Sequence, residues 1–299
     1  MAFKIAIASG KGGTGKTTVS VNLFHHFNEV YSGSVQLVDC DVEEPNDIIF
    51  LPDAEKLSTT PIFQQIPKID TTKCTYCRAC VDYCEFNAIV VIPPIKFTEV
   101  NASLCHSCGA CLVACQHNAI IEQPHEIGSV SKFINSNGAV VVEGRLKVGS
   151  AMQSMLIKEV KRCVVEADDI IIYDAPPGTS CPVVETLSDT DYVILVTEPT
   201  PFGLHDLRLM VELLKDVQIP FGVVVNKAGL GDNSLYEYLL LEGIEILGEL
   251  PFSRSFASAY ATGSVFENIQ NNISDSYKKI IGNINQRMLE NEGDNYFKW

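Results

Sequence analysis

Short, nearly continuous apolar runs alternate with longer mixed segments along most of this chain. Apolar runs of strand length are typical of strands that helices cover on both faces, as in a parallel sheet. The pattern therefore predicts an α/β fold, with a mostly parallel sheet flanked by helices. The predicted strands are residues 3–9, 35–40, 139–144, 169–175, 192–198, 221–227 and 244–250, and the predicted helices are residues 15–29, 151–167, 202–217, 232–242 and about 265–291.

One segment, residues 68–125, breaks this alternation and contains an internal duplication. Its cysteines form two runs with the same C-x2-C-x2-C-x3-C spacing, and the second run lies 31 positions after the first. The sequence Asn-Ala-Ile follows each run at the same offset. Because strand-and-helix alternation resumes afterwards, we expect an insertion. The predicted organisation is an α/β domain of residues 1–67 and 126–299 and a small α+β module of residues 68–125.

The composition restricts the classes of function. A formal net charge of −15 argues against general nucleic-acid binding, which requires a basic surface. The N-terminus has no signal-peptide pattern, and the apolar runs are far shorter than the about 18 residues of a membrane span. Eight of the eleven cysteines lie in the two runs at ligand spacing, which indicates metal binding in a reducing compartment. We therefore expect a cytoplasmic protein.

The stretch GKGGTGKT at residues 10–17 satisfies the phosphate-binding pattern G-x-x-x-x-G-K-[ST] between a predicted strand and a predicted helix. Glycines let backbone N–H groups approach phosphates, and the helix N-terminus adds a positive dipole. Lys16 is expected to reach the β- and γ-phosphates of ATP, and the Thr17 hydroxyl to bind Mg²⁺. The predicted nucleotide-binding residues here are Gly10, Lys11, Gly12, Gly13, Thr14, Gly15, Lys16, Thr17 and Thr18.

The loop carries a second lysine, and the sequence KGGTGKT resembles the deviant Walker A motif of the MinD, ParA, Mrp and nitrogenase-iron-protein class of ATPases. VDCDVEEPN (38–46) resembles the switch I region of that class, and YDAPPG (173–178) resembles switch II. VVVNK (223–227) and GELPFS (248–253) resemble its adenine-side segments. The resemblance implies an ATPase that works as a homodimer, or as a heterodimer with a related ATPase. It also implies that Lys11 contacts the nucleotide of the partner subunit.

The resemblance also implies roles for individual polar residues. Asp41 would orient the hydrolytic water, Asp39 would support Mg²⁺ and the loop, and Asp174 would contact Mg²⁺ through water. Asn226 would read adenine, beside Pro251 and Phe252. For the two switch I aspartates the alternative is a turn or capping carboxylate, and Asn226 could merely cap a strand.

The duplicated cysteine runs resemble bacterial two-cluster ferredoxins, in which each run gives three thiolates to one [4Fe–4S] cluster and its fourth to the other. Structural zinc is the alternative for Cys-x-x-Cys pairs. Glu85 and Gln116 follow the fourth cysteines, where ferredoxins usually have proline. The crossed pattern implies two ligand sets, one of Cys74, Cys77, Cys80 and Cys115 and one of Cys105, Cys108, Cys111 and Cys84.

The remaining cysteines and two histidines have less specific signals. Cys181 lies seven residues after Asp174, the offset of a cluster-bridging cysteine in the nitrogenase iron protein, but Ser150 stands where the second bridging cysteine would be. We therefore expect Cys181 to be a buried or interface residue rather than a ligand. Cys40 and Cys163 are predicted core residues. His106 and His117 are expected to be surface residues, with proton-coupled redox chemistry as the alternative.

Together these features predict a dimeric ATPase that couples an ATP switch to electron transfer through two [4Fe–4S] clusters, with a redox or metallocluster protein as partner. One alternative is an ATPase that assembles or carries iron–sulfur clusters or another metal cofactor. Another is a positioning ATPase of the MinD or ParA type with redox sensing. The acidic C-terminal sequence lacks the basic amphipathic helix of a membrane anchor.

Overall fold

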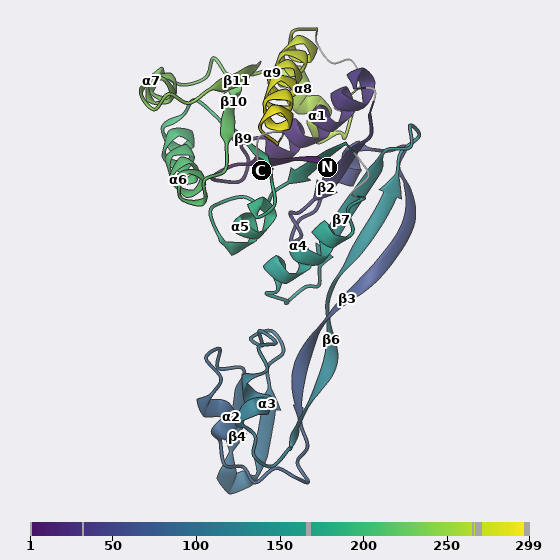
Figure 1. The fold of residues 1–299 in the computed structure, drawn as a ribbon, viewed down its shortest axis with the longest axis vertical. Coiled ribbons are helices and arrows are strands. Elements are labelled where there is room, and N and C mark those ends of the chain that lie inside the picture. Colours follow the sequence, from purple (N-terminus) through teal and green to yellow (C-terminus); the bar gives the residue numbers. More distant parts are fainter. Residues whose placement is uncertain (1, 32, 166–168, 265, 267–270, 296–299) are drawn as a thin grey trace.

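The structure is a computed structural model that describes residues 2–31, 33–165, 169–264, 266 and 271–295. Seven of its strands pair in parallel, and two long antiparallel strands extend one edge of the sheet (Figure 1). Across the sheet the order is β11 (Ile246–Pro251), β10 (Phe221–Ala228), β9 (Tyr192–Thr197), β1 (Phe3–Ala8), β8 (Ile170–Asp174), β2 (Val35–Asp39), β7 (Val140–Leu146), β6 (Ile120–Ile134) and β3 (Glu55–Ile69).

Helices cover both faces of the parallel part of the sheet. Alternate residues of β1 belong to opposite cores: Ile5 and Ile7 pack with one set of helices, and Ala6 with the other. The first face is covered by α1 (Lys16–Val30), α8 (Arg254–Ala261) and α9 (Asn271–Asn295), and the second by α4 (Gln153–Arg162), α5 (Cys181–Leu187), α6 (Pro201–Val217) and α7 (Ser234–Leu241). The predicted α/β fold with a mostly parallel sheet is confirmed, and each predicted strand is present.

Two helix predictions differ from the structure in their extent. The helix predicted for residues 151–167 ends at Arg162, and residues 166–168 lie outside the described part. The last helix begins no earlier than Asn271 among the described residues, while 265 and 267–270 are not described. The helices α5 and α8 were not predicted, because seven or eight residues give too short a pattern to recognise.

Strands β3 and β6 form a two-stranded ribbon, which we call the stalk. They pair over their full length, from Glu55 opposite Ile134 to Ile69 opposite Ile120. Only residues 128–134 of β6 also pair with β7, so the other half of the stalk projects beyond the sheet. Fifteen residues of strand span about 50 Å. Figure 1 shows the far end of the stalk carrying residues 70–119, which we call the cysteine module.

The cysteine module contains two short helices and one hairpin. Its elements are α2 (Ala79–Asp82), β4 (Ile89–Ile92), β5 (Phe97–Val100) and α3 (Ala110–Ala114). A small core of its own includes Ile89, Val91 and Cys111 together with Ile120 at the end of the stalk. That the inserted module is a separate domain stays a prediction. Its predicted boundaries, 67/68 and 125/126, fall inside β3 and β6.

The stalk strands lack the apolar runs by which the other strands were predicted. Residues 55–61 of β3 are all exposed, so these residues have no buried face that would require apolar side chains. The same strand contains Pro61 and Pro67, which usually argue against a strand. Proline is tolerated because β3 is the edge of the sheet and pairs on one side only. No helix in the described part of the chain combines the length and apolar character needed to cross a membrane.

Candidate functional site

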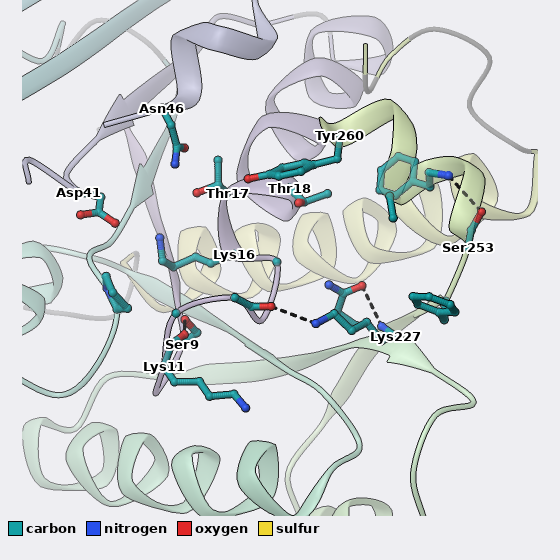
Figure 2. A pocket seen from close by; sticks show the side chains of 18 of the residues that line it. Ser9, Lys11, Lys16, Thr17, Thr18, Asp41, Asn46, Lys227, Ser253 and Tyr260 are labelled. Atoms are coloured by element: carbon teal, nitrogen blue, oxygen red, sulfur yellow. Dashed lines mark hydrogen bonds between the residues drawn. The ribbon is translucent and has the colours of Figure 1, made fainter. Parts of the chain in front are cut away.

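A cavity of about 400 Å³ opens at the carboxyl ends of the parallel strands, around the loop between β1 and α1 (Figure 2). This is where ligands bind in open α/β sheets, and the volume fits a small molecule. The structure brings most of the predicted nucleotide-binding residues to its wall. They are Lys11, Gly12, Gly13, Gly15, Lys16, Thr17, Thr18, Asp41, Asn226, Pro251 and Phe252.

Three glycines give the loop its shape. Gly13 and Gly15 have φ angles of 80° and 92°, which residues with a side chain adopt at a cost. A Cβ atom on Gly15 would also lie 2.2 Å from Nδ2 of Asn226, and one on Gly10 would lie 2.4 Å from the carbonyl oxygen of Asp206 in α6. The loop is thus held between β10 and α6 at positions that only glycine can occupy.

Lys16 and Thr17 both contact Asp174, the residue that ends β8. The Lys16 ammonium lies 3.1 Å from Oδ1 of Asp174, and the Thr17 hydroxyl donates to Oδ2 at 2.8 Å. Ser20, one turn further along α1, donates to Oδ1 at 2.8 Å. Burial lowers the pKa of Lys16, but Asp174, Asp41 and Asp39 outweigh it and raise the pKa, so the lysine is charged. A charged lysine and a hydroxyl at this end of the helix suit a phosphate and its metal ion.

Three buried carboxyl groups meet beneath the loop, and one of them was not predicted. Asp39, Asp47 and Asp174 each offer an oxygen within 4.8 Å of the others. Backbone N–H groups of Asp41, Asn46 and Asp47 donate to Asp39, whereas both side-chain oxygens of Asp47 are buried without a hydrogen-bond partner. Such a set could hold a divalent cation.

The crowding of these carboxyl groups changes their pKa values. Burial, and then the charge of Asp174, raises the pKa of Asp39 to about 8. Burial and the charges of Asp39 and Asp174 raise the pKa of Asp47 well above its ordinary value. Asp41 lies on the cavity wall, and burial raises its pKa, while Lys16 opposes that shift. Asp47 was not predicted because it follows several other acidic residues in VDCDVEEPN, and nothing in the sequence indicates that this one is buried.

Asn226 and Lys227 connect the end of β10 to the phosphate-binding loop. Nδ2 of Asn226 donates to the Thr14 carbonyl at 2.7 Å, and its Oδ1 accepts from the backbone of Lys227. The Lys227 ammonium donates to the Gly13 carbonyl at 3.0 Å. In this arrangement Asn226 braces the loop, and its second amide hydrogen, which has no acceptor among the described residues, could bind a nucleotide base.

The opposite side of the cavity is apolar and comes from α8. Phe256, Ala257 and Tyr260 line it beside the predicted Pro251 and Phe252. Figure 2 shows the Tyr260 side chain extending over Thr17 and Thr18, and its ring packs 4.8 Å from that of Phe50. An aromatic wall next to a phosphate loop suits a nucleoside. Sequence reasoning missed the α8 residues because the helix itself was not predicted.

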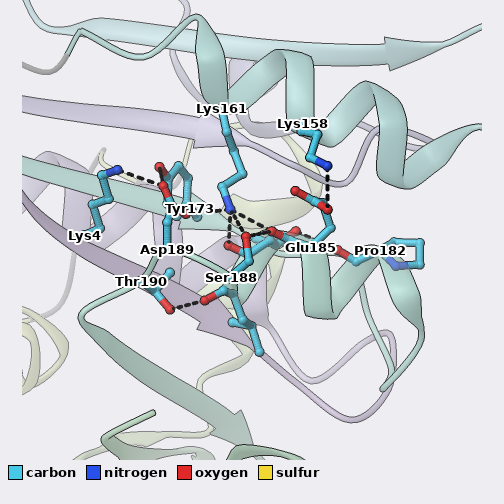
Figure 3. A network of polar contacts seen from close by, with 11 residues as sticks. Lys4, Lys158, Lys161, Tyr173, Pro182, Glu185, Ser188, Asp189 and Thr190 are labelled. Carbon is cyan, nitrogen blue, oxygen red and sulfur yellow. Dashed lines mark hydrogen bonds and ion pairs between the residues drawn. The ribbon is translucent and has the colours of Figure 1, made fainter. Parts of the chain in front are cut away.

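A polar network that includes Tyr173 of β8 holds α5, the helix after the YDAPPG segment (Figure 3). The Lys161 side chain in α4 is only 8% exposed, and its ammonium donates to the carbonyl oxygens of Glu185 and Thr186 at the end of α5. It also pairs with Asp189. A lysine at a helix C-terminus satisfies carbonyl groups that have no partner within the helix. Cys181, at the other end of α5, is exposed, so of the two predicted settings it is not a buried residue, and its place in an interface stays a prediction.

In the cysteine module, the duplicated sequence produces a duplicated backbone. Left-handed residues occur at equivalent positions of the two halves: Tyr76 and Ser107, Arg78 and Gly109, and Asn87 and Asn118. Backbone N–H groups point at the thiols, with Tyr76 donating to Cys74, Ala88 to Cys84 and Ala119 to Cys115, each at 3.3–3.4 Å. Strained loops whose amides point at sulfur are suited to hold a charged group between them.

The thiols are grouped across the two halves. Burial raises the pKa of Cys80, and the neighbouring thiols of Cys74, Cys115 and Cys77 raise it further. Burial likewise raises the pKa of Cys105, with contributions from Cys108 and Cys84. Cys115 of the second cysteine run therefore lies near thiols of the first run, and Cys84 of the first run lies near thiols of the second.

The second cysteine loop is attached to the stalk. Gln64 of β3 is buried, and its side chain donates to the Ala102 carbonyl at 3.3 Å and accepts from the Ser107 hydroxyl. Ser107 also lies 2.6 Å from the Gln65 carbonyl. His106, beside Cys105, stacks on Phe86 with ring centroids 3.8 Å apart. Of the predicted core cysteines, Cys40 is buried and Cys163 is half-buried.

Comparison with known proteins identifies the nucleotide-binding fold. The model of the CobQ/CobB/MinD/ParA nucleotide binding domain matches residues 5–288, nearly the whole chain. The chain belongs to this family. Its fold resembles that of the cell division ATPase MinD from Pyrococcus furiosus, with a TM-score of 0.59 at 19% identity over 96% of this chain and 99% of that one.

Several known proteins are similar to this chain over most of their own length. An uncharacterised protein of Methanocaldococcus jannaschii, MJ0579, is 31% identical over 88% of this chain and 90% of its own. A second protein of that organism, MJ0578, is 29% identical over 93% of this chain and 95% of its own. The iron-sulfur cluster carrier protein of the same organism is 23% identical over 95% of this chain and 84% of its own. The chain is thus a nucleotide-binding protein of the MinD/ParA type.

Proposed function

We propose that this protein is a nucleotide-dependent dimeric ATPase that couples an ATP switch to electron transfer through two [4Fe–4S] clusters in the cysteine module. ATP and Mg²⁺ would occupy the cavity, with Lys16 on the phosphates and Thr17 on the metal ion. Asp39, Asp41 and Asp174 would act as predicted from the sequence, and Asp47 would join them in compensating the charge of Mg²⁺.

The observation that carries the proposal is a backbone connection from switch I to the stalk. The Val42 carbonyl, next to Asp41, accepts from the Leu146 N–H at 2.7 Å. Leu146 pairs with Gly128 of β6, and the next residue, Lys147, donates to the Ile127 carbonyl at 2.8 Å. A movement of switch I on hydrolysis would therefore act directly on the base of the stalk.

The cysteine module fits a group larger than one zinc ion. Among the described residues, Asp39, Asp47 and Asp174 form the only group whose ligand atoms all lie within 4.8 Å, so no three cysteine sulfurs do. Four thiolates around one zinc ion would lie about 3.8 Å apart. The two crossed groups of thiols instead suit two [4Fe–4S] clusters, which would supply one-electron transfer.

Thermodynamic linkage tests the coupling. With the iron-loaded protein under anaerobic conditions, we would measure the affinity for ATP in the oxidised and reduced states and the cluster potentials with and without ATP. Coupling requires that the ATP affinity depend on the redox state and that the cluster potential depend on bound ATP. A tenfold change in ATP affinity must match a shift of about 59 mV in the potential for one electron. The Lys16→Ala variant should retain its iron and lose the shift, and Lys215→Ala should retain both. Potentials that are unaffected by bound ATP would contradict the proposal.

The similarity to iron-sulfur cluster carrier proteins favours a second candidate, cluster delivery. The two functions differ in whether iron leaves the protein. An apo-ferredoxin acceptor, separated afterwards by size, would gain iron in an ATP-dependent way from a carrier. From an electron-transfer ATPase it would gain none, while the iron content of the donor stays constant over many turnovers.

A further inference from the structure

We propose that Glu198 is a latch that holds Lys11 within its own subunit and sets how readily two ATP-bound subunits associate. This inference rests on the proposed function, in which Lys11 contacts the partner's nucleotide. Glu198 is not a catalytic residue in this view. It is a positioning residue that acts through the lysine.

The Glu198 carboxylate binds two lysines at the edge of the cavity. Its Oε1 lies 3.0 Å from the Lys11 ammonium, and its Oε2 lies 2.8 Å from the Lys227 ammonium. Only 12% of the Glu198 side chain is exposed. Both positive charges therefore share one largely buried carboxylate, which is a stronger partner than a surface acid.

The position of Glu198 is fixed by the turn into α6. Its backbone carbonyl accepts from the Thr200 N–H at 2.8 Å, and the Thr200 hydroxyl lies 3.3 Å from Oε1. The first turn of α6 lies so close that a Cβ atom on Gly203 would lie 2.2 Å from the Glu198 carbonyl. The carboxylate is thus a built acceptor for Lys11 rather than a mobile side chain that meets it by chance.

Two cations on one carboxylate allow one of them to leave. Lys227 also donates to the Gly13 carbonyl, so it stays in place when Lys11 departs. Glu198 then keeps one positive partner, and no uncompensated charge is buried, which would otherwise cost several kcal/mol. The lysine that departs is Lys11, because Lys227 has this second partner, whereas the exposed fractions of the two side chains, 31% and 34%, are similar.

The surroundings of Lys11 face outward. Its ammonium lies 5.7 Å from the centre of the Phe202 ring, and Phe202 is 76% exposed. A large exposed aromatic residue beside a lysine on the rim of a nucleotide cavity suits contact with a second copy of this chain. On association Lys11 would exchange Glu198 for the partner's phosphates.

The experiment compares dimerisation of Glu198→Gln with that of the wild type, in the presence of a hydrolysis-resistant ATP analogue and Mg²⁺. Glutamine keeps the shape and one acceptor oxygen for Lys227, but it weakens the hold on Lys11. We expect the dimer dissociation constant, measured by analytical ultracentrifugation, to fall about fivefold. Glu242→Gln is the matched control, because it breaks a 2.7 Å ion pair between α6 and the end of α7 that is distant from the cavity. This control should not change the constant.

The double variant Lys11→Met/Glu198→Gln tests whether the Glu198 substitution changes dimerisation through Lys11 or in another way. Without Lys11 the Glu198 substitution should have no further effect on dimerisation. A dissociation constant that is unchanged or higher in Glu198→Gln, or a loss of ATP binding by its monomer, would overturn the latch. If instead the wild type does not dimerise with the analogue, or Lys11→Met dimerises equally well, the proposed function itself is wrong at this step.

Discussion

The two ends of this molecule both gather groups that repel one another, but they do so by different means. At the nucleotide end, Asp39, Asp47 and Asp174 are buried in the core of the sheet, and one lysine, Lys16, compensates them. At the stalk end, eight cysteines lie in loops and two short helices, and six of them are half-buried or exposed. The first group is assembled from segments far apart in the sequence, and the second from two local repeats.

This difference indicates which end depends on its ligand for stability. The acidic group is part of the main hydrophobic core, so its charges oppose folding unless protons or a cation compensate them. Within the described part of the chain, the cysteine loops have two small apolar clusters beneath them rather than the main core. We therefore expect the nucleotide end to fold without its ligands and to respond to pH, and the module to depend on its metal.

The prediction with the largest expected effect tests whether each cluster takes its fourth cysteine ligand from the other cysteine run (crossed sets) or from its own run (uncrossed sets). Cys115→Ser should remove the cluster of Cys74, Cys77 and Cys80, so bound iron should fall from about eight to about four atoms per chain. Adding Cys74→Ser should change nothing more, because both cysteines serve one cluster. Adding Cys105→Ser instead should remove the remaining iron. Iron analysis and electron paramagnetic resonance would report each step, and four iron atoms left in Cys105→Ser/Cys115→Ser would show that the sets are not crossed.

The second prediction concerns pH and the nucleotide-free protein. The pKa of Asp39 is raised from 3.8 to about 8 in the folded state, so its contribution to stability is fully present below pH 3.8 and is lost as the pH rises through 8. The pKa of Asp47 is raised in the same direction. Asp47→Asn removes one of the repelling charges, and we expect it to stabilise the protein at pH 9 by about 1–3 kcal/mol and much less at pH 5.

Thermal unfolding across this pH range would measure the effect. Glu43→Gln is the control, because it neutralises an exposed carboxylate of the same loop and should leave the pH dependence unchanged. Equal effects of the two substitutions would mean that net charge, rather than the buried group of aspartates, governs the stability of this end.

The smallest expected effect distinguishes the two cysteine loops. Gln64→Ala removes the side chain that joins the stalk to Ala102 and Ser107, and no equivalent contact joins the stalk to the first loop within the described residues. We expect an iron chelator to remove the second cluster about three- to tenfold faster, with the first unchanged. Gln65→Ala is the matched control, since its side chain is exposed and only its backbone accepts from Ser107. Equal loss of both clusters in Gln64→Ala would contradict an asymmetric module.

Much of the fold followed from the sequence because its signals are local. The apolar runs, such as that of β8, predicted the strands of the parallel sheet, since each is covered on both faces. The sequence GKGGTGKT predicted the family, because a phosphate loop needs its glycines and lysine at fixed spacing. The repeat of the cysteines predicted an internal duplication, and the structure has left-handed residues at the same positions in both halves.

Other features depend on contacts between distant segments, and only the tertiary structure decided them. The stalk is polar and contains prolines, so its strands are defined by their pairing partners rather than by burial. Asp47 joins Asp174 because β2 and β8 are neighbours, although 127 positions separate the two residues. Glu198 meets Lys11 because β9 lies next to β1 in the sheet. Sequence spacing determines chemistry within a loop, whereas the order of strands determines which charges meet across loops.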